Sequence, residues 1–371
     1  MRKKLAIIIP RFGKNILGGA ERYTFQLARI LSQKYEVHIL TTTANDHITW
    51  EEKYSAGKYE EDNWVVHRFK IDRARTKYWD ELQNLLIETP PTHWSYKLSE
   101  EWLVHQGPIS QGLLDHLQTQ KYDKYIFVGY LYAPIYFGLE FVDRSKVWLL
   151  PTYHDELPFY LPIFEKYRFF RHLFLTNAEK ELAQRRFGEE IEGEIIGFGI
   201  EDRWNEETND EKYVLYAGRL ESSKGVASLI KFHQKFFEKY DIPLYLIGQG
   251  PLSENLPKGV EYKGFVSEEE KFRYMQKALA FIHPSAYESL GIVLLEAFMM
   301  HTPALINARS EVLSDHILQS KGGMCFEGQE EYIKNLLQVI DNRQRYGYNA
   351  RRYYEKYFSY DVFRNRVLNL I

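Results

Sequence analysis

Two glutamates separated by eight residues are the clearest candidates for chemistry in this chain. Glu288 and Glu296 lie in the stretch PSAYESLGIVLLEAFMMHTP, residues 284–303, on either side of Gly291. On one continuous helix an offset of eight residues turns through about 800°, so the two carboxylates would miss a common face by roughly 80°. We therefore expect Glu288 in a loop after a buried strand, and Glu296 one to two turns into a helix that begins near residues 289–291.

The expected start of this helix is a candidate anion site. Ser289, Leu290, Gly291 and Ile292 would present free backbone N–H groups at the positive end of the helix dipole. Glu296, about 5 Å further along the axis for each turn, would reach a hydroxyl attached to that anion. A phosphate with a sugar alcohol on each side describes a sugar nucleotide. The simpler alternative is ordinary α/β packing with a solvated glutamate.

Two cations follow the strand expected at residues 213–218. Arg219 and Lys224 stand in the segment YAGRLESSKG and flank the start of the next expected helix. Arginine offers a planar fork to phosphate oxygens and lysine a point charge, so the pair suits a phosphate group. Either residue taken alone is equally well explained as a solvated surface cation.

Glycine-bearing turns mark further strand ends. Gly18 and Gly19 open a helix and permit close backbone approach to an anion, although they form neither a P-loop nor a GxGxxG fingerprint. A tight turn is the simpler interpretation of these two glycines. Gly248, in the segment IGQGP, and Phe265 with Val266, in the segment GFV, lie in turns that would bracket a flat base.

His154 ends another expected strand, and a structural histidine is the alternative to a functional one. Ligands of open α/β sheets bind outside the carboxyl ends of the strands, which is where His154 stands. The sequence has no Asp-x-Asp pair, no HExxH and no CxxC spacing, so we expect neither a metal nor a cofactor. Arg219, Lys224 and backbone donors would then replace a divalent ion beside a leaving diphosphate. No GxSxG elbow supports a Ser-His-Asp triad.

The composition excludes several classes of protein. A length of 371 residues suits two domains, and a formal net charge of −3 gives no basic field for nucleic acid. The single cysteine, Cys325, excludes a disulfide framework within the chain and fits a reducing compartment. Residues 5–10 are too short for the apolar core of a secretion signal, and residues 125–142 are interrupted by Pro134 and two glycines. We therefore expect a soluble, cytoplasmic protein.

Short apolar runs alternate with helical patterns along the chain, which is typical of parallel α/β sheets. A linker is expected at residues 201–212, and residues 73–110, rich in Trp, Tyr and Pro, predict an irregular insertion. Ser267 with Glu270 predicts a capping box at the start of a helix. The expected strands cover residues 5–10, 37–43, 64–71, 125–129, 147–152, 174–176, 194–200, 213–218, 244–248, 260–262, 280–284, 304–307 and 324–326. We expect two α/β halves with a cleft between them.

Taken in order, these segments resemble the GT-B-fold retaining glycosyltransferases of family 4, or glycosyl transferases group 1. The resemblance spans nearly all of the chain. It rests on GGAER, TYHDE, YAGRLESSKG, IGQGP, GFV and the E-x7-E stretch of residues 284–303. The opening PRFGKNILGGAER, with TTTANDHITW and LLPTYHDE, is similar to a bacterial subgroup that builds surface polysaccharides.

The resemblance implies two Rossmann-like domains that face each other across a cleft. Residues 1–203 would bind the acceptor, residues 204–352 would bind the nucleotide sugar, and a helix over residues 353–371 would cross back to the first domain. Gly18 and Gly19 would approach the donor diphosphate from the first domain.

The same resemblance implies roles for the charged residues. Glu296 would bind the ribose hydroxyls, Glu288 the hydroxyls of the transferred sugar, and Arg219 with Lys224 the diphosphate. His154 would sit near the reacting sugar. The implied reaction is a metal-independent, retaining transfer from a UDP-, GDP- or other NDP-sugar to a glycan or lipid-linked saccharide. The leaving phosphate oxygen would take the proton of the acceptor hydroxyl in a front-face step.

Some alternatives stay open. Residues 304–312 read ALINARSEV where many members of this family carry Gly-Gly before the Glu, so residues 308–311 are given no role. A catalytically silent GT-B protein that binds a glycan or another transferase is a competing hypothesis, as is a nucleotide-sugar epimerase or a phosphorylase. The basic and aromatic run at residues 166–171 predicts either an ordinary amphipathic helix or a peripheral contact with the inner membrane face.

Overall fold

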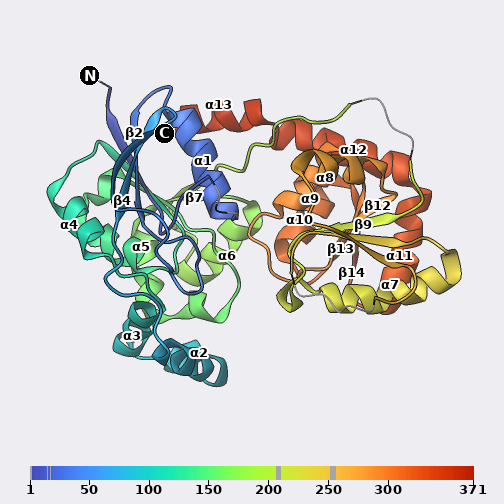
Figure 1. Cartoon of the computed structure of the whole chain (residues 1–371), viewed down its shortest axis with the longest axis horizontal. Coiled ribbons are helices and arrows are strands. Elements are labelled where there is room, and N and C mark those ends of the chain that lie inside the picture. Colours follow the sequence, from blue (N-terminus) through green and yellow to red (C-terminus); the bar gives the residue numbers. More distant parts are fainter. Residues whose placement is uncertain (1, 15, 17, 206–209, 251–255) are drawn as a thin grey trace. The chain divides into compact units, whose positions relative to one another are not determined.

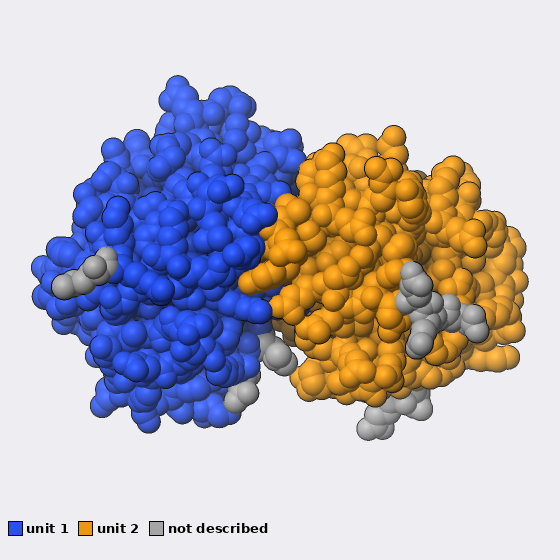
Figure 2. Space-filling model, turned by 90° about the horizontal axis from the view of Figure 1, so that it is seen from above, with its two compact units in different colours: residues 1–196, 364–371 blue, residues 197–363 orange. Residues whose placement is uncertain are grey.

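The computed structural model describes residues 2–14, 16, 18–205, 210–250 and 256–371. Its contacts divide the chain into two compact units (Figure 2). Unit 1 comprises residues 1–196 and 364–371, and unit 2 comprises residues 197–363. Each unit has a mostly or wholly parallel sheet of its own, covered by helices (Figure 1).

The sheet of unit 1 has eight strands among the described residues, in the order β3-β4-β2-β1-β5-β6-β7-β8. All neighbouring pairs are parallel except β3 with β4. The strands are β1 (Lys4–Ile8), β2 (Glu36–Thr42), β3 (Gly57–Glu61), β4 (Trp64–Phe69), β5 (Lys124–Val128), β6 (Val147–Leu150), β7 (Arg171–Phe174) and β8 (Gly193–Ile195). The expected parallel architecture is therefore confirmed.

Burial explains which strands the sequence predicts. Residues 5–8 of β1 are fully buried, and such continuous apolar runs are typical of strands covered on both faces. The edge strand β3 was not expected, because its sequence GKYEE is polar and its residues are largely exposed. The strand expected at residues 174–176 is shifted, since β7 ends at Phe174 and Thr176 caps the next helix.

The expectation of an irregular insertion at residues 73–110 is wrong. This part of unit 1 contains α2 (Tyr78–Glu88) and α3 (Tyr96–Gln106), joined through a short 3-10 turn at Pro91–His93. Leu82 and Leu86 lie one helical turn apart and are both buried, so they give α2 an apolar face. The Pro90-Pro91 pair, which suggested a break in structure, stands between these two helices.

The other helices of unit 1 cover its sheet. They are α1 (Gly19–Leu31), α4 (Gln111–Thr119), α5 (Ala133–Gly138) and α6 (Asn177–Phe187), with 3-10 segments η2 (Leu139–Phe141), η3 (Arg144–Lys146), η4 (Leu157–Tyr160) and η5 (Pro162–Phe169). The basic and aromatic run at residues 166–171 therefore ends a 3-10 segment and enters β7, so an ordinary amphipathic α-helix is not what it forms.

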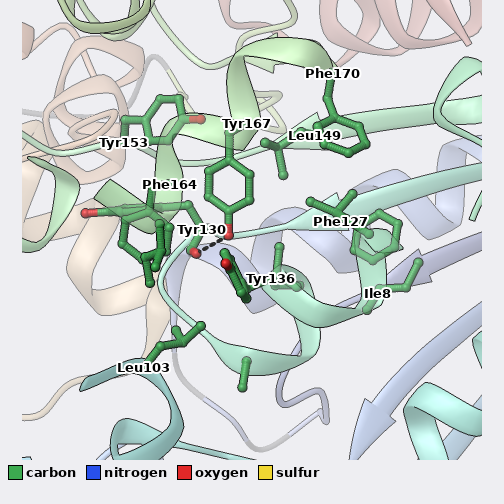
Figure 3. Close-up of a cluster of buried hydrophobic side chains, with 14 of the residues drawn as sticks. Ile8, Leu103, Phe127, Tyr130, Tyr136, Leu149, Tyr153, Phe164, Tyr167 and Phe170 are labelled. Atoms are coloured by element: carbon green, nitrogen blue, oxygen red, sulfur yellow. Dashed lines mark hydrogen bonds between the residues drawn. The ribbon is translucent and has the colours of Figure 1, made fainter. Parts of the chain in front are cut away.

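Aromatic side chains fill the core of unit 1 beside β5 and β6 (Figure 3). Tyr153, Phe164 and Tyr167 are fully or almost fully buried there. The Tyr167 hydroxyl donates a hydrogen bond to the backbone oxygen of Tyr130 at 2.7 Å. Buried tyrosines that keep a polar partner retain the hydrophobic benefit of the ring without an unsatisfied hydroxyl.

Unit 2 has a wholly parallel sheet of six strands among the described residues, in the order β11-β10-β9-β12-β13-β14. All six were expected, and β13 has the predicted bounds. The strands are β9 (Val214–Ala217), β10 (Leu244–Ile247), β11 (Val260–Gly264), β12 (Ala280–His283), β13 (Ala304–Asn307) and β14 (Gly323–Phe326). The order of the strands along the chain reverses direction between β9 and β12, so this is a doubly wound sheet with a topological switch point between these two strands.

The helices of unit 2 include the one expected after Gly291. Ser267 and Glu270 form the predicted capping box at the start of α8. The helices are α7 (Val226–Tyr240), α8 (Glu268–Lys277), α9 (Ile292–Met299), α10 (Glu311–Ser320), α11 (Gln329–Asp341) and α12 (Arg343–Tyr357), with the 3-10 turn η6 (Ser222–Lys224).

The C-terminal segment contains two helices where one was expected over residues 353–371. Helix α12 ends at Tyr357 and α13 (Tyr360–Leu370) follows. Residues 364–371 belong to unit 1, where the Tyr35 hydroxyl and the Lys124 ammonium both donate to the backbone oxygen of Ile371. In the described part of the chain no helix is both long and apolar enough to cross a membrane.

Candidate active site

Backbone hydrogen bonds tie together the loops that follow three strands of unit 2. The Gly218 N–H donates to the oxygen of Ile247 at 3.0 Å, and the Gly248 N–H donates to the oxygen of Gly264 at 3.0 Å. Gly248 has φ +138°, and a Cβ there would lie 1.8 Å from the oxygen of Gly218. Only glycine fits this position, so Gly248 acts by permitting the loops after β9 and β10 to touch. Pro251 of the same segment lies outside the described residues.

Lys224 and Glu288, 64 residues apart, meet in this region. The Lys224 Nζ lies 2.6 Å from the Glu288 Oε1, and both side chains are mostly buried. Gly225 starts α7 with φ +75°, and a Cβ there would lie 2.6 Å from the oxygen of Pro284. The loop after β9 therefore rests directly on the loop after β12. This contact brings one predicted cation to one predicted carboxylate.

His283, which the sequence analysis did not single out, belongs to the same cluster. Its Nε2 lies 3.8 Å from the Glu288 Oε1, while its Nδ1 is buried with no hydrogen-bond partner among the described residues. Burial lowers the pKa of the His283 imidazole. Burial would raise the pKa of the Glu288 carboxyl, but His283, Lys224 and the hydrogen bond from Lys224 together outweigh burial and lower it. Glu288 is therefore a carboxylate at neutral pH.

The segment from Glu288 to the first turn of α9 is held firmly in place. The backbone oxygen of Leu290 accepts a hydrogen bond from the His316 Nε2 at 2.8 Å. Gly291, with φ +70°, caps α9, and a Cβ there would lie 2.6 Å from a Leu313 methyl carbon. Helix α9 begins at Ile292 with Gly291 as its N-cap, just after the expected start at residues 289–291, so Ser289 and Leu290 lead into the helix without belonging to it. The N–H groups of its first turn have no acceptor within their own helix.

Glu296, on α9, is paired separately from Glu288. Its side chain is 0% exposed, and its Oε2 lies 2.7 Å from the Nζ of Lys271 on α8. Lys271 stands in a run of charged residues, EEEK, and nothing in the sequence distinguished it. The structure therefore gives each predicted glutamate its own lysine. Of these two lysines the sequence singles out only Lys224, as a ligand of the diphosphate and not as a partner of Glu288.

Arg219 does not join the pair of Lys224 and Glu288. It is exposed, and its guanidinium lies 3.2 Å from a carboxylate oxygen of Glu221. The buried Tyr216 hydroxyl donates to the backbone oxygen of Arg219 at 2.7 Å, which fixes the backbone but leaves the side chain at the surface. Phe265 is 62% exposed and Val266 is half-buried, so the predicted platform for a base is open to solvent.

Gly18 and Gly19 begin α1 of unit 1, as expected from the sequence. Gly18 has extended backbone, and a Cβ there would lie 1.9 Å from a carboxylate oxygen of Glu21. That carboxylate is buried and pairs with the Arg11 Nε at 2.6 Å. The space in front of Gly18 is therefore taken by a carboxylate of the chain itself, while Gly19 is exposed.

His154 lies in the loop after β6 of unit 1 and is half-buried. Its backbone oxygen accepts from the Glu156 N–H at 2.9 Å, and within the described part of the chain its imidazole has no hydrogen-bond partner. Tyrosine hydroxyls occupy the two neighbouring carboxylates, at 2.6 Å for Asp155 and 2.7 Å for Glu156. The His154 imidazole is thus free, while the two acidic side chains that follow it are hydrogen-bonded. No group of three or more His, Cys, Asp or Glu residues with the geometry to hold a metal occurs in the described ranges.

Comparisons with known proteins agree with this geometry. Residues 200–353, which hold the loops of unit 2 described above, match the family of glycosyl transferases group 1. An uncharacterized glycosyltransferase of Methanocaldococcus jannaschii is 32% identical over 129 residues, which cover 30% of this chain and 33% of that protein. The chain therefore spans about a third of the length of this relative.

Two longer similarities cover both units. The N-acetylgalactosamine-N,N'-diacetylbacillosaminyl-diphospho-undecaprenol 4-alpha-N-acetylgalactosaminyltransferase of Campylobacter jejuni is 25% identical over 360 residues, covering 92% of this chain and 87% of that protein. The structure of sucrose-phosphate synthase from Thermosynechococcus elongatus matches with a TM-score of 0.69 at 15% identity, over 100% of this chain and 98% of the other. Residues 200–353 are thus similar to the glycosyl transferases group 1, and the two sheet-bearing units have the GT-B fold seen in solved glycosyltransferase structures.

Proposed function

We propose that this protein is a retaining, metal-independent glycosyltransferase of family 4. It moves a sugar from a nucleotide-diphosphate sugar to a glycan or lipid-linked acceptor. The observation that carries the proposal is the Lys224–Glu288 pair at 2.6 Å, beside the start of α9 and at the carboxyl ends of β9 and β12. Ligands of doubly wound sheets bind at this edge, near the point where the strand order reverses.

Each charged group has a distinct part in binding the donor. Lys224 and the backbone N–H groups of residues 289–292 bind the diphosphate, and Arg219, which is exposed, turns toward it as a second cation. Glu288 accepts hydrogen bonds from hydroxyls of the transferred sugar. Glu296, held by Lys271, binds the ribose hydroxyls. The carboxylates accept and the cations donate, so a donor with hydroxyls on both sides of a diphosphate satisfies both kinds of group.

The transfer step follows from the charges. As the bond between the anomeric carbon and the diphosphate breaks, negative charge grows on the leaving oxygen, and Lys224 with the helix N-terminus stabilises it. The acceptor hydroxyl attacks the same face, and the leaving phosphate oxygen takes its proton. His154, on unit 1, positions the reacting sugar through its free imidazole. These roles make a divalent metal unnecessary, because the protein supplies the positive charge.

The class of acceptor is suggested by the relatives. The name of the Campylobacter jejuni relative describes an acceptor linked to diphospho-undecaprenol, and an Acholeplasma laidlawii relative, 26% identical over 149 residues, is named alpha-monoglucosyldiacylglycerol synthase. A lipid-linked acceptor would place the protein in the cytoplasm, in peripheral contact with the inner face of a membrane.

Phe169, 60% exposed beside Arg168, is the side chain that would make this contact. Co-sedimentation with anionic vesicles, lost in Phe169→Ser, tests this contact, and equal sedimentation of the two proteins would rule it out.

A direct test of the proposed function is a screen of nucleotide sugars. The protein should be stabilised against thermal unfolding by one nucleotide diphosphate and by its sugar derivative, since ligands that bind only the folded state raise its stability. Transfer to an acceptor should then persist in EDTA and give a product with the anomeric configuration of the donor. Nucleotide binding without transfer to any acceptor would favour the alternative, a silent GT-B protein that supports another transferase. No binding to any nucleotide would remove the donor site altogether.

A further inference from the structure

Unit 1 contains a buried carboxylate to which the proposed reaction gives no role. Glu179, in the first turn of α6, is 1% exposed. Its Oε1 accepts the N–H of Tyr153 at 2.8 Å, and its Oε2 accepts the N–H of Leu175 at 2.6 Å. The backbone of Thr152 also lowers the pKa of this carboxyl.

These backbone groups come from two neighbouring strands. Thr152 and Tyr153 follow β6, and Leu175 follows β7, which pairs with β6 in parallel. The N–H of Glu179 itself donates to the Thr176 hydroxyl, which caps α6. One carboxylate therefore joins the ends of two strands and the start of a helix at the carboxyl edge of the sheet.

The segment that Glu179 holds leads directly to His154. Thr152 has φ +55°, a left-handed conformation that is uncommon for a β-branched residue and persists where the surroundings impose it. Because the carboxylate accepts the N–H of Tyr153, the residue after Thr152, it stabilises this bend in the backbone two residues before His154.

Tyr153 is fixed from its other end as well. Its ring packs 4.7 Å from that of Phe159, centre to centre, and its hydroxyl lies 3.1 Å from the His172 Nε2 (Figure 3 shows the Tyr153 ring within the aromatic cluster). His154, in contrast, has a free imidazole. A rigid residue thus precedes a free one, which is the arrangement expected where the backbone must aim a functional side chain.

A purely structural role explains Glu179 poorly. Burying a carboxylate is costly unless hydrogen bonds or a counter-charge compensate for the lost hydration. At Glu179 backbone N–H groups provide this compensation. A side chain that is never charged would cap the same strand ends at a lower desolvation cost. A carboxyl group, once ionised, accepts from N–H groups of both strand ends with its two oxygens.

We propose that Glu179 is the positioning residue for His154, acting through the backbone of Thr152 and Tyr153. The inference rests on the proposed function, in which His154 contacts the reacting sugar. Glu179, on α6, would then affect the rate of transfer although its carboxylate does not touch the substrate.

The protonation of Glu179 gives this role a measurable signature. Burial raises the pKa of its carboxyl to about 8, against the lowering effect of the three backbone groups. Its charge interacts with the hydroxyls of Tyr23 on α1 and of Tyr153. Arg366 lowers the pKa of Tyr23, and Arg186 lowers the pKa of Tyr153. Burial raises the pKa of both phenols well above 10, so Glu179 is the member of this group that titrates near neutrality. The carboxylate accepts the N–H groups of Tyr153 and Leu175 better than the protonated acid does, so positioning should improve as the pH rises through about 8.

The experiment compares Glu179→Gln with Glu181→Gln, a matched control on the exposed side of the same helix. Glutamine keeps the shape but replaces one acceptor oxygen by a donor, so an N–H from one strand end loses its partner. Above pH 8, where Glu179 is a carboxylate, we expect kcat to fall about 10- to 100-fold, as for a reacting group displaced by about 1 Å, with the donor KM within about two-fold. The rise of kcat around pH 8 should be present in the wild type and in Glu181→Gln and absent in Glu179→Gln. An unchanged kcat and pH profile in Glu179→Gln would overturn the proposal.

Amide hydrogen exchange provides a second readout that does not depend on activity. Peptides covering residues 150–156 and 173–177 should exchange faster in Glu179→Gln than in the wild type or in Glu181→Gln. If no donor supports transfer by any of the proteins, the proposed function fails, and this measurement still decides whether Glu179 orders the His154 segment. Unchanged exchange would refute that ordering. If Glu179→Gln does not fold, Glu179→Asp, which keeps the charge but is one methylene too short to reach both strands, takes its place in both measurements.

Discussion

The two lysine–glutamate pairs of unit 2 resemble each other in distance and differ in setting. Lys224 and Glu288 lie 2.6 Å apart on two loops, with 22% and 17% of their side chains exposed. Lys271 and Glu296 lie 2.7 Å apart on two helices, with 19% and 0% of their side chains exposed. Both side chains of the first pair are therefore partly accessible, while in the second pair only the lysine is, and its carboxylate is buried.

The difference separates chemistry from architecture. A pair on loops can exchange its partners for substrate groups, because little packing depends on it. A buried pair between helices resists such exchange, because removing one partner leaves an uncompensated charge in a poorly hydrated site. We infer that the first pair contributes to the rate of transfer, and that the second contributes to folding and presents one glutamate for binding. Four changes test this contrast.

Lys224→Met should have the largest effect, and the effect should fall on catalysis. Losing a cation at the leaving diphosphate should reduce kcat about 100- to 1,000-fold, or about 3–4 kcal/mol of transition-state stabilisation, as for the loss of one oxyanion donor. The measurement is steady-state transfer with the donor found in the nucleotide screen. Lys235→Met, an exposed lysine on α7 that pairs with Glu238, is the matched control and should keep normal turnover. A near-normal kcat in Lys224→Met would show that the first pair does not contribute to the rate of transfer.

Lys271→Met should act mainly on stability. It leaves the Glu296 carboxylate buried without the cation on α8, and we expect a loss of about 2–3 kcal/mol in the free energy of unfolding, measured by urea denaturation. The double variant Lys271→Met/Glu296→Gln should recover much of that loss, because no charge remains to be compensated. If Lys271→Met is as stable as the wild type, the second pair is not architectural.

The sequence predicts those parts of unit 2 in which local pattern determines structure. The buried run of β13, the capping box of Ser267 and Glu270, and the helix start after Gly291 all follow from spacing within a few residues. The fold class follows too, because alternating strands and helices leave few other arrangements. The helices at residues 78–106 were missed because aromatic and proline residues masked the spacing of Leu82 and Leu86.

The partners of the functional residues could not be predicted in the same way. Lys271 is 25 residues from Glu296, and Glu179 is 26 residues from Tyr153, so no local pattern records either contact. His283 did carry a signal, since it ends a predicted strand as His154 does, but its unpartnered Nδ1 and its distance of 3.8 Å from Glu288 are properties of the folded chain. Sequence spacing thus places a residue at the carboxyl edge of a sheet without identifying what it faces there.

Glu296→Gln and Glu288→Gln should divide binding from turnover. Replacing Glu296 should weaken nucleotide diphosphate binding about 10-fold, since a charge-assisted hydrogen bond to a ribose hydroxyl contributes about 1.5 kcal/mol. Replacing Glu288 should leave nucleotide diphosphate affinity nearly unchanged and lower the rate of transfer, because its proposed partner is the sugar. Calorimetry with the nucleotide diphosphate alone gives the first result and kinetics the second. Equal nucleotide affinity in all three proteins would remove the ribose role of Glu296.

The smallest expected effect is a dependence of stability on acid pH that belongs to Glu288. Because the pKa of its carboxyl in the folded protein is lowered from the ordinary value of 4.5, the carboxylate stabilises the fold above that value, and this contribution is lost as the pH falls through the lowered folded value. At pH 7 Glu288→Gln should be about 1 kcal/mol less stable than the wild type, and the gap should close below pH 4. Thermal unfolding between pH 3 and pH 7 measures the gap, with Glu238→Gln, an exposed glutamate, as a control that stays parallel to the wild type. A gap that stays constant over this range would mean that the charge of Glu288 does not contribute to stability.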